Sequence, residues 1–277
     1  MRAIELVCAD DGPLPLLPGR RDLGFLDDVA RQVLPRDDGP TPDEIAKGKE
    51  VAHLGAPRRA VQRPSEPVRL IVVGPDASLA AVVTHLMRRN LLWFEVAHVP
   101  TAPSPAATNW GITGTGGGEH GLSPAEALER PVRPVPLVRD DTGHVIVGYA
   151  LLTGPDATGM SSRGGLAGEV WVDSVELFAG SAHGVQVRPL PDAPGLVAAE
   201  LPPPPGRGRG LFRRPLSDVD GLADSAGNPR ALHEPVTGRA VQAGGPGFRY
   251  VRDGVEPRKP REKATIYRHL LDLQLVR

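Results

Sequence analysis

The sequence of 277 residues predicts a parallel α/β domain over residues 1–130, followed by an antiparallel β-sandwich domain over residues 131–277. The first domain is indicated by residues 68–73, a β-branched apolar run that passes through a turn into an apolar stripe of helical spacing. The second domain is indicated by a change near residue 130 to short apolar runs separated by glycine and aspartate turns. Hydrophobic residues make up 40% of the chain, which is enough to build the cores of two such domains.

The N-terminal elements follow from their apolar patterns. Residues 2–8 are expected to form a first strand, and the apolar stripe over residues 23–34 predicts a helix that ends at Pro35. A polar, linker-like tract covers residues 36–66 and includes one helix expected at residues 42–54, where a threonine cap precedes a proline at the first helical position.

The central strand–turn–helix unit is the sharpest local signal of the chain. The strand at residues 68–73 ends in a short turn, and a helix is expected from about Ser78 through Arg89. A second apolar run, residues 91–99, predicts another strand that ends in the proline-rich loop 100–105. In parallel sheets of this kind ligands bind at the carboxyl ends of the strands, so the turn and the loop belong to the candidate site.

The second half of the chain is predicted to be mostly strands. A short helix is expected to open at Ser123, where a serine cap precedes a proline and a glutamate three residues on. Residues 202–215 combine four prolines with arginines and glycines and are expected to be a disordered loop. The expected strands lie at residues 133–137, 144–152, 170–178, 185–189, 239–243, 249–252 and 271–275.

Composition excludes several classes of protein. Lys and Arg number 32 against 33 Asp and Glu, and this balance argues against a nucleic-acid-binding protein. A single cysteine, Cys8, excludes an intramolecular disulfide framework and any multi-cysteine metal site. No signal peptide and no apolar run of about eighteen residues is present, so we expect a cytoplasmic protein. No histidine pair has metal-binding spacing, so no metal site is expected from the histidines. A homodimer is an open alternative to a monomer.

The turn after the central strand is the first candidate site. The N-terminus of a helix offers free N–H groups and a partial positive charge, which favour a bound phosphate. Asp76 in this turn suits phosphate only if the carboxylate holds a metal ion or orients a hydroxyl. The alternative is that Asp76 and Ser78 merely cap the helix that follows.

These residues resemble the catalytic domain of the diacylglycerol kinase and lipid kinase family. In that family a strand enters Gly-Gly-Asp-Gly-Thr-Leu-Asn-Glu-Val-Val, and residues 72–83 here are similar to it. The loop at residues 104–112 resembles the family's Pro-x-Gly-Thr-x-Asn-Asp loop, and residues 250–254 resemble the strand that carries its Asp-Gly-Glu. NAD kinases share the Gly-Gly-Asp-Gly turn, but the Leu-x-x-Val-Val continuation favours the lipid kinase branch.

The resemblance implies two sets of site residues. Asp76 and Asp253 are implied as catalytic residues, and Gly74, Ser78 and Asn109 as residues that bind ATP with Mg²⁺. The implied reaction is ATP-dependent phosphoryl transfer to a lipid hydroxyl.

The sequence departs from the family at three motifs. Pro75 removes a backbone donor from the turn, and Ala77 adds a Cβ where the phosphates would approach. Ala106, Ala107 and Trp110 replace Gly, Thr and Asp in the second loop, and Val255 stands where the family has its glutamate base. A catalytically inactive binding or regulatory module is therefore the alternative function.

A basic cluster is a candidate membrane contact. The arginines could attract an anionic bilayer at the inner membrane face, and the two apolar residues between them could form a shallow wedge. The alternative is a solvated linker. The cluster consists of Arg207, Arg209, Leu211, Phe212, Arg213 and Arg214.

Overall fold

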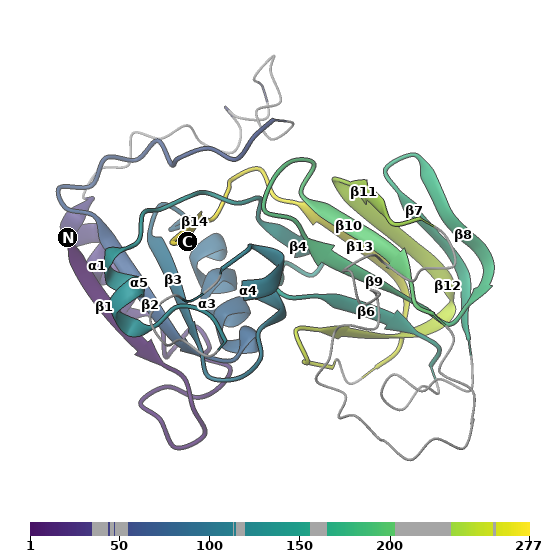
Figure 1. Ribbon diagram of the computed structural model, residues 1–277, viewed down its shortest axis with the longest axis horizontal. Helices are drawn as coiled ribbons and strands as arrows, with labels where there is room; N and C mark the ends of the chain where they lie inside the picture. Colours follow the sequence, from purple (N-terminus) through teal and green to yellow (C-terminus); the bar gives the residue numbers. More distant parts are fainter. Residues whose placement is uncertain are drawn as a thin grey trace.

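A computed structural model describes residues 1–34, 44, 47, 55–112, 114, 120–155, 165–202, 234–256 and 259–277. It contains a small parallel sheet with helices and a larger antiparallel assembly, which lie side by side along the long axis of the molecule (Figure 1). The expected fold class is confirmed. The basic cluster lies outside the described residues, as does almost all of the helix expected at residues 42–54.

The first sheet has four parallel strands in the order β1-β2-β3-β14. The central strand β2 is buried at nearly every position, because helices cover both faces of the sheet. The strands are β1 (Arg2–Val7), β2 (Val68–Gly74), β3 (Glu95–Pro100) and β14 (Gln274–Leu275).

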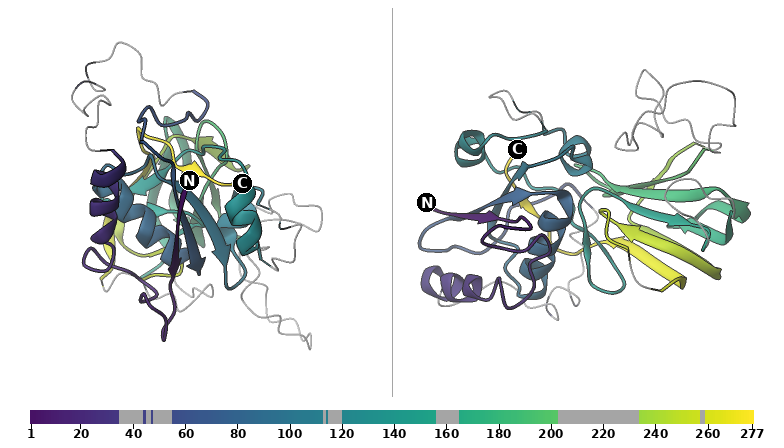
Figure 2. Two further views of the ribbon diagram at one scale, coloured as in Figure 1. Left: turned by 90° about the vertical axis from the view of Figure 1, so that its left-hand side faces the viewer. Right: turned by 90° about the horizontal axis from the view of Figure 1, so that it is seen from below.

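The helices of this domain follow from amphipathic patterns and caps. Helices α1 (Phe25–Val33) and α3 (Asp76–Arg88) lie on one face of the sheet, and α5 (Pro124–Glu129) lies on the other (Figure 2, right). Ser123 and Glu126 form the expected capping box of α5. The guanidinium of Arg69 in β2 donates to three carbonyl oxygens at the end of α5, those of Ala127, Leu128 and Arg130.

The second domain is built from two antiparallel sheets that share the long strand β12. The first half of β12 pairs with β7 and β13, and its last four residues pair with β6. The strands are β4 (Val138–Asp140), β5 (Val145–Ile146), β6 (Ala150–Thr153), β7 (Leu166–Val172), β8 (Val175–Ala182), β9 (Gly184–Pro189), β10 (Leu196–Glu200), β11 (Val236–Gly238), β12 (Ala240–Arg252) and β13 (Arg261–Arg268).

A glycine-rich irregularity lets β12 pass from one sheet to the other. Its register with β13 shifts between Gly244 and Phe248. At Gly245 a Cβ would lie 2.3 Å from the carbonyl oxygen of Ala167 on β7, so the two backbones approach as closely as only glycine allows. The sequence had predicted two separate strands here, because the glycines interrupt the apolar pattern.

Several expected boundaries are wrong for physical reasons. Strand β3 begins at Glu95 rather than residue 91, because residues 91–94 form a buried turn closed by the amide of Phe94 on the carbonyl of Leu91. The run at residues 170–178 is two strands, β7 and β8, joined by a turn at Asp173, where φ is +52°. Strands β4, β10, β11 and β13 lie outside the expected ranges, and residues 133–137, expected as a strand, contain only an isolated bridge at Val135.

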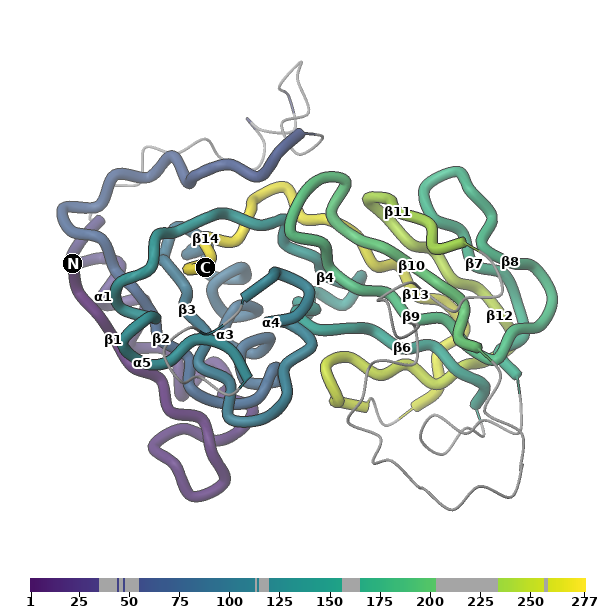
Figure 3. Tube along the Cα trace, in the orientation of Figure 1, coloured from purple at the N-terminus to yellow at the C-terminus, as the bar shows by residue number. Residues whose placement is uncertain are grey.

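The C-terminal segment links the two domains. The alternating leucines at residues 271–275 were expected in the sandwich, yet β14 returns to the first domain and pairs with β3 (Figure 3). Leu273 and Leu275 are fully buried in the core of the parallel sheet. No helix within the described parts of the chain is long and apolar enough to span a membrane.

Candidate functional site

Asp76 is the first residue of α3 and sits at the carboxyl end of β2. The helix has Pro75 at its N-cap and no side-chain cap, so the expectation that Asp76 and Ser78 cap their own helix is wrong. Instead, the Asp76 carboxylate accepts hydrogen bonds from the Ser104 hydroxyl at 2.5 Å and from the Ala106 amide at 2.8 Å. Asp76 therefore satisfies the N-terminus of the next helix, α4 (Pro105–Asn109).

Gly74 and Ser78 face the interior of the domain. The Ser78 side chain is fully buried, and its hydroxyl donates to the carbonyl oxygen of Leu16 at 2.6 Å. A Cβ at Gly74 would lie 3.0 Å from the carbonyl oxygen of Cys8, and the Gly74 φ is +154°. Both residues thus have structural roles where β1 and β2 end side by side.

Asn109 and Asp253 meet at one backbone segment, residues 147–149, between β5 and β6. The Asn109 amide group donates to the carbonyl oxygens of Val147 at 3.4 Å and Gly148 at 2.6 Å. The Asp253 carboxylate accepts from the amides of Val147 at 3.1 Å, Gly148 at 2.7 Å and Tyr149 at 2.9 Å. One segment of the second domain is therefore held by a side chain from each domain.

Gly148 brings the two carboxylates together. A Cβ at this position would lie 2.8 Å from Oδ2 of Asp76 and 3.1 Å from Oδ1 of Asp253. The structure therefore unites three of the five expected site residues, Asp76, Asn109 and Asp253, around one glycine. We name this set, with residues 147–149, the interdomain latch.

The latch has an unusual electrostatic environment. Burial, followed by the charge of Asp76, raises the pKa of Asp253 from 3.8 to about 7, although the three backbone N–H groups act in the opposite direction. Burial and the charges of Asp253 and Asp76 also raise the pKa of the Tyr149 phenol. At neutral pH the Asp253 carboxyl group is therefore partly protonated.

Asp253 and Gly254 form a two-residue turn after β12. Both have positive φ, +45° and +80°, and the amides and carbonyls of Arg252 and Val255 exchange two hydrogen bonds. This is the pattern of a tight type I′ hairpin turn, for which Asp-Gly is a favoured sequence. Glu256, the residue after Val255, forms an ion pair with Arg249. It therefore does not supply the carboxylate that the family has at the position of Val255.

His98 on β3 is a buried neighbour of Asp76. Its Nε2 lies 3.0 Å from the Gly74 carbonyl oxygen, and its Nδ1 lies 3.9 Å from Asp76 Oδ1. Burial lowers the pKa of His98, while the Asp76 charge and the Gly74 carbonyl act against this. The ring is therefore neutral and fixes the end of β2 against β3.

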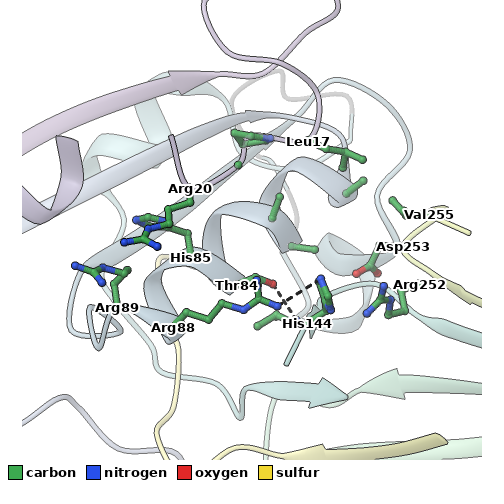
Figure 4. A pocket seen from close by; sticks show the side chains of 16 residues that line it. Leu17, Arg20, Thr84, His85, Arg88, Arg89, His144, Arg252, Asp253 and Val255 are labelled. Carbon is green, nitrogen blue, oxygen red and sulfur yellow. Dashed lines mark hydrogen bonds between the residues drawn. The ribbon is translucent and has the colours of Figure 1, made fainter. Parts of the chain in front are cut away.

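A cavity of about 370 Å³ lies beside the latch, between α3 and the second domain. Figure 4 shows Arg20, His85 and Arg89 grouped at one end, and Arg252, Asp253 and Val255 at the other. Among the described residues no cluster of three or more His, Cys, Asp or Glu side chains is suited to a metal ion.

Sequence reasoning missed three residues of the latch and its surroundings. Ser104 precedes Pro105 at a helix start, the same signal that correctly predicted α5 at Ser123, so it could have been found. Gly148 stands alone within an expected strand, a pattern that indicates close backbone approach. His98 lies within an expected strand, and no pattern in the neighbouring sequence indicates that it belongs to a site.

Comparisons with known proteins agree with this architecture. No family model matches the chain, and no curated protein is similar in sequence. A protein from Bacillus anthracis assigned as a diacylglycerol kinase is 12% identical, with a TM-score of 0.50, over 74% of this chain and 75% of that chain. An NAD kinase from Archaeoglobus fulgidus, solved with ATP, is 12% identical with a TM-score of 0.47, over 100% of this chain and 94% of that chain. The likeness to the Bacillus anthracis structure shows a shared fold, and the expected resemblance is confirmed at the level of fold.

Proposed function

We propose that this chain is a binding module with a kinase fold, in which the residues that resemble a catalytic set hold the two domains together. The observation that carries the proposal is that the latch side chains already serve structural contacts. Both oxygens of Asp76, both oxygens of Asp253 and the amide group of Asn109 already have partners within the protein. A metal ion or a substrate hydroxyl at these carboxylates would compete with the hydrogen bonds that hold α4 and residues 147–149 in place.

The turn fits a magnesium–nucleotide complex poorly. Pro75 cannot donate to a phosphate, and the hydroxyl of Ser78 is buried and bound to Leu16. A Mg²⁺ ion at Asp76 would compete with Ser104 and Ala106 for the carboxylate, and loss of either hydrogen bond would leave the start of α4 unsatisfied. A buried donor left without a partner typically costs about 1–3 kcal/mol, which would oppose nucleotide binding at this turn.

The second candidate is ATP-dependent phosphoryl transfer to a lipid hydroxyl of the diacylglycerol type. It is favoured by the pKa of Asp253, which burial raises to about 7, because a general base works best when its pKa is near the working pH. Asp253 also lines the cavity, where a substrate hydroxyl could approach. In this candidate Asp253 would accept the proton of the lipid hydroxyl.

One experiment separates the two candidates. The full chain is incubated with labelled ATP, Mg²⁺ and vesicles that contain diacylglycerol, and the lipids are analysed for label. The binding module should give no labelled lipid, and its melting temperature should not change with ATP and Mg²⁺. Labelled lipid that disappears in Asp253→Asn, but persists in the exposed control Asp173→Asn, would overturn the binding module in favour of the kinase.

A further inference from the structure

The chain passes between the two domains twice, and the two crossings pair with each other. Residues 130–137 lead from α5 to β4, and residues 269–273 lead from β13 to β14. Val135 and Leu273 exchange two backbone hydrogen bonds, at 3.0 and 2.9 Å. We name this antiparallel pair of crossings the crossing ribbon. Because it carries both covalent connections, any rotation of one domain against the other must bend or twist it.

A short segment before β2, residues 55–60, lies along the crossing ribbon, and we name it the strap. The side chain of Gln274 in β14 binds its backbone at two points. It donates to the carbonyl oxygen of Arg58 at 3.2 Å and accepts from the amide of Ala60 at 3.1 Å. The Asp272 carboxylate accepts from the amide of Arg58 at 2.9 Å. One end of the strap is thus fixed to the last strand of the first domain.

Arg268, the last residue of β13, ties the other end of the strap to the second domain. Its buried guanidinium donates to the carbonyl oxygen of Gly55 at 3.0 Å and to the Asp272 carboxylate at 2.9 Å. Arg59 of the strap donates to the carbonyl oxygen of Val132, in the other crossing, at 2.7 Å. The strap therefore contacts both crossings and spans the boundary between the two domains.

The strap can detach without unfolding either domain. None of its six residues is buried, and of these six only Ala60 packs against the apolar core of the first domain. A segment that is held by hydrogen bonds near solvent, with little buried apolar surface, opens at a much lower cost in free energy than a whole domain. The contacts between the strap and the crossing ribbon can therefore be released separately.

Away from the strap, the domains meet through a few hydrogen bonds beside the cavity. The amide of Val145 donates to the hydroxyl of Thr84 on α3 at 2.9 Å, and the Arg88 guanidinium donates to the carbonyl oxygen of Gly143 at 3.1 Å. Thr84, Arg88 and Val145 all line the cavity. In Figure 1 the strap lies at the top of the molecule, whereas α4 and β6, which flank the latch, lie lower. Rotation about the crossing ribbon would break these bonds and widen the cavity.

We propose that the strap is a regulatory brace, which holds the two domains closed over the cavity while it is docked and lets them open when it detaches. The docked strap is fixed to β14 in the first domain and to the end of β13 in the second. Rotation about the crossing ribbon would change the distance between these two points, so the strap resists it. The proposal goes beyond the proposed function and holds for both candidates, because a bound ligand and a substrate would need the same access to the cavity.

The test is hydrogen–deuterium exchange of the full chain, followed residue by residue by NMR. The Val145 amide reports domain opening, because its acceptor Thr84 belongs to the other domain, and the amides of β2 report unfolding of the first domain. Ala60→Pro removes the amide that Gln274 binds. It should accelerate exchange at Val145 about tenfold, the usual effect of a lost hydrogen bond with a buried acceptor, and leave the β2 amides unchanged.

Val61→Pro is the matched control, since the amide of Val61 donates to no acceptor in the described part of the chain and its side chain is exposed. This variant should exchange like wild type at Val145.

A second pair of variants leaves the backbone of the strap unchanged. Arg59→Gln removes the contact with Val132 and should accelerate exchange at Val145 about threefold, whereas Arg63→Gln, at an exposed residue, should not. Wild-type exchange at Val145 in either strap variant would overturn the proposal. Equal acceleration of Val145 and the β2 amides would also overturn it, because the strap would then stabilise the whole protein rather than the closed domains. These measurements use no ATP and no lipid, so their failure leaves the proposed function standing.

Discussion

Replacing Asp253 with Asn should remove a pH-dependent loss of stability. In the folded protein burial raises the pKa of this carboxyl group from 3.8 to about 7. As the pH rises above 3.8, the unfolded chain releases this proton, while the folded protein keeps it until about pH 7. The folded state therefore binds more protons in this window, and the free energy of unfolding falls as the pH rises.

The size of the effect follows from the shift. A difference of roughly 3 pKa units, between 3.8 and about 7, corresponds to about 4 kcal/mol at 1.4 kcal/mol per unit. Most of it, about 3 kcal/mol, should be lost between pH 4.5 and pH 8, because the unfolded group is already partly ionised at the lower pH. The Asp253 side chain is buried, so solvent screening does not reduce this figure greatly.

The assay is urea unfolding of wild type and Asp253→Asn across this pH range, followed by tryptophan fluorescence. The difference between the two proteins must be used, because burial lowers the pKa of His85, His98 and His144 in the folded state. These rings contribute stability that is lost as the pH falls through 6.5, so they oppose the Asp253 effect in the wild-type curve.

Asp173→Asn is the matched control for this experiment. The Asp173 carboxylate also accepts backbone N–H groups, from Arg239 and Ala240, and its residue also has positive φ, but it is exposed to solvent. Only the Asp253→Asn difference should shrink with rising pH. A difference that stays constant from pH 4.5 to 8 would refute the reasoning, since it would mean that the three backbone donors outweigh burial and keep Asp253 ionised.

Three further predictions concern the latch, the sandwich and the basic cluster. Gly148→Ala should destabilise the protein by about 2–4 kcal/mol in urea unfolding, because the new Cβ displaces two carboxylates from their donors. The control Gly55→Ala, with open space around it, should change the stability little. Equal unfolding midpoints for the two variants would show that the backbone at Gly148 can move to accept the Cβ. Gly245→Ala should lower the melting temperature by several degrees, since its Cβ would meet the Ala167 carbonyl at 2.3 Å, and an unchanged temperature would contradict the sheet crossing at β12. The cluster at residues 207–214 should bring the chain to anionic vesicles in flotation, with binding lost in high salt or when its arginines are replaced by serine, and equal flotation with neutral vesicles would exclude this contact.

The sequence predicted the elements whose formation depends on residues that are close together in the chain. The β-branched run of β2 and the Ser123–Glu126 capping box needed no tertiary information. The position of residues 271–275 did need tertiary information, because alternating leucines fit either sheet. In the structure Leu273 and Leu275 are buried in the core of the first domain. The bend of β12 was not predicted, because its glycines fit a loop between two strands as well as an irregularity within one strand.

The site was predicted in part, because the sequence shows the candidate side chains but does not show which groups they hydrogen-bond to. Asp76, Asn109 and Asp253 were identified and do come together. No local pattern indicated that Asp76 would cap α4 rather than its own helix, since that depends on where α4 is placed against β2. Nor could it indicate that Ser78 would be bonded to Leu16, a residue far away in the chain.

The contacts of the latch join the candidate site to the cavity through one continuous set of hydrogen bonds. Asp76 fixes the start of α4, and Asn109 at the end of α4 holds Gly148 from the first domain. Asp253 holds the same glycine from the second domain and also lines the cavity. Asp253 thus belongs both to the latch and to one end of the cavity, and the charge of Asp76 beside Gly148 adds to burial in raising its pKa. Loss of the proton from Asp253 therefore acts on residues 147–149, a segment held by side chains of both domains, and this is why ionisation of Asp253 should weaken the folded state as the pH rises.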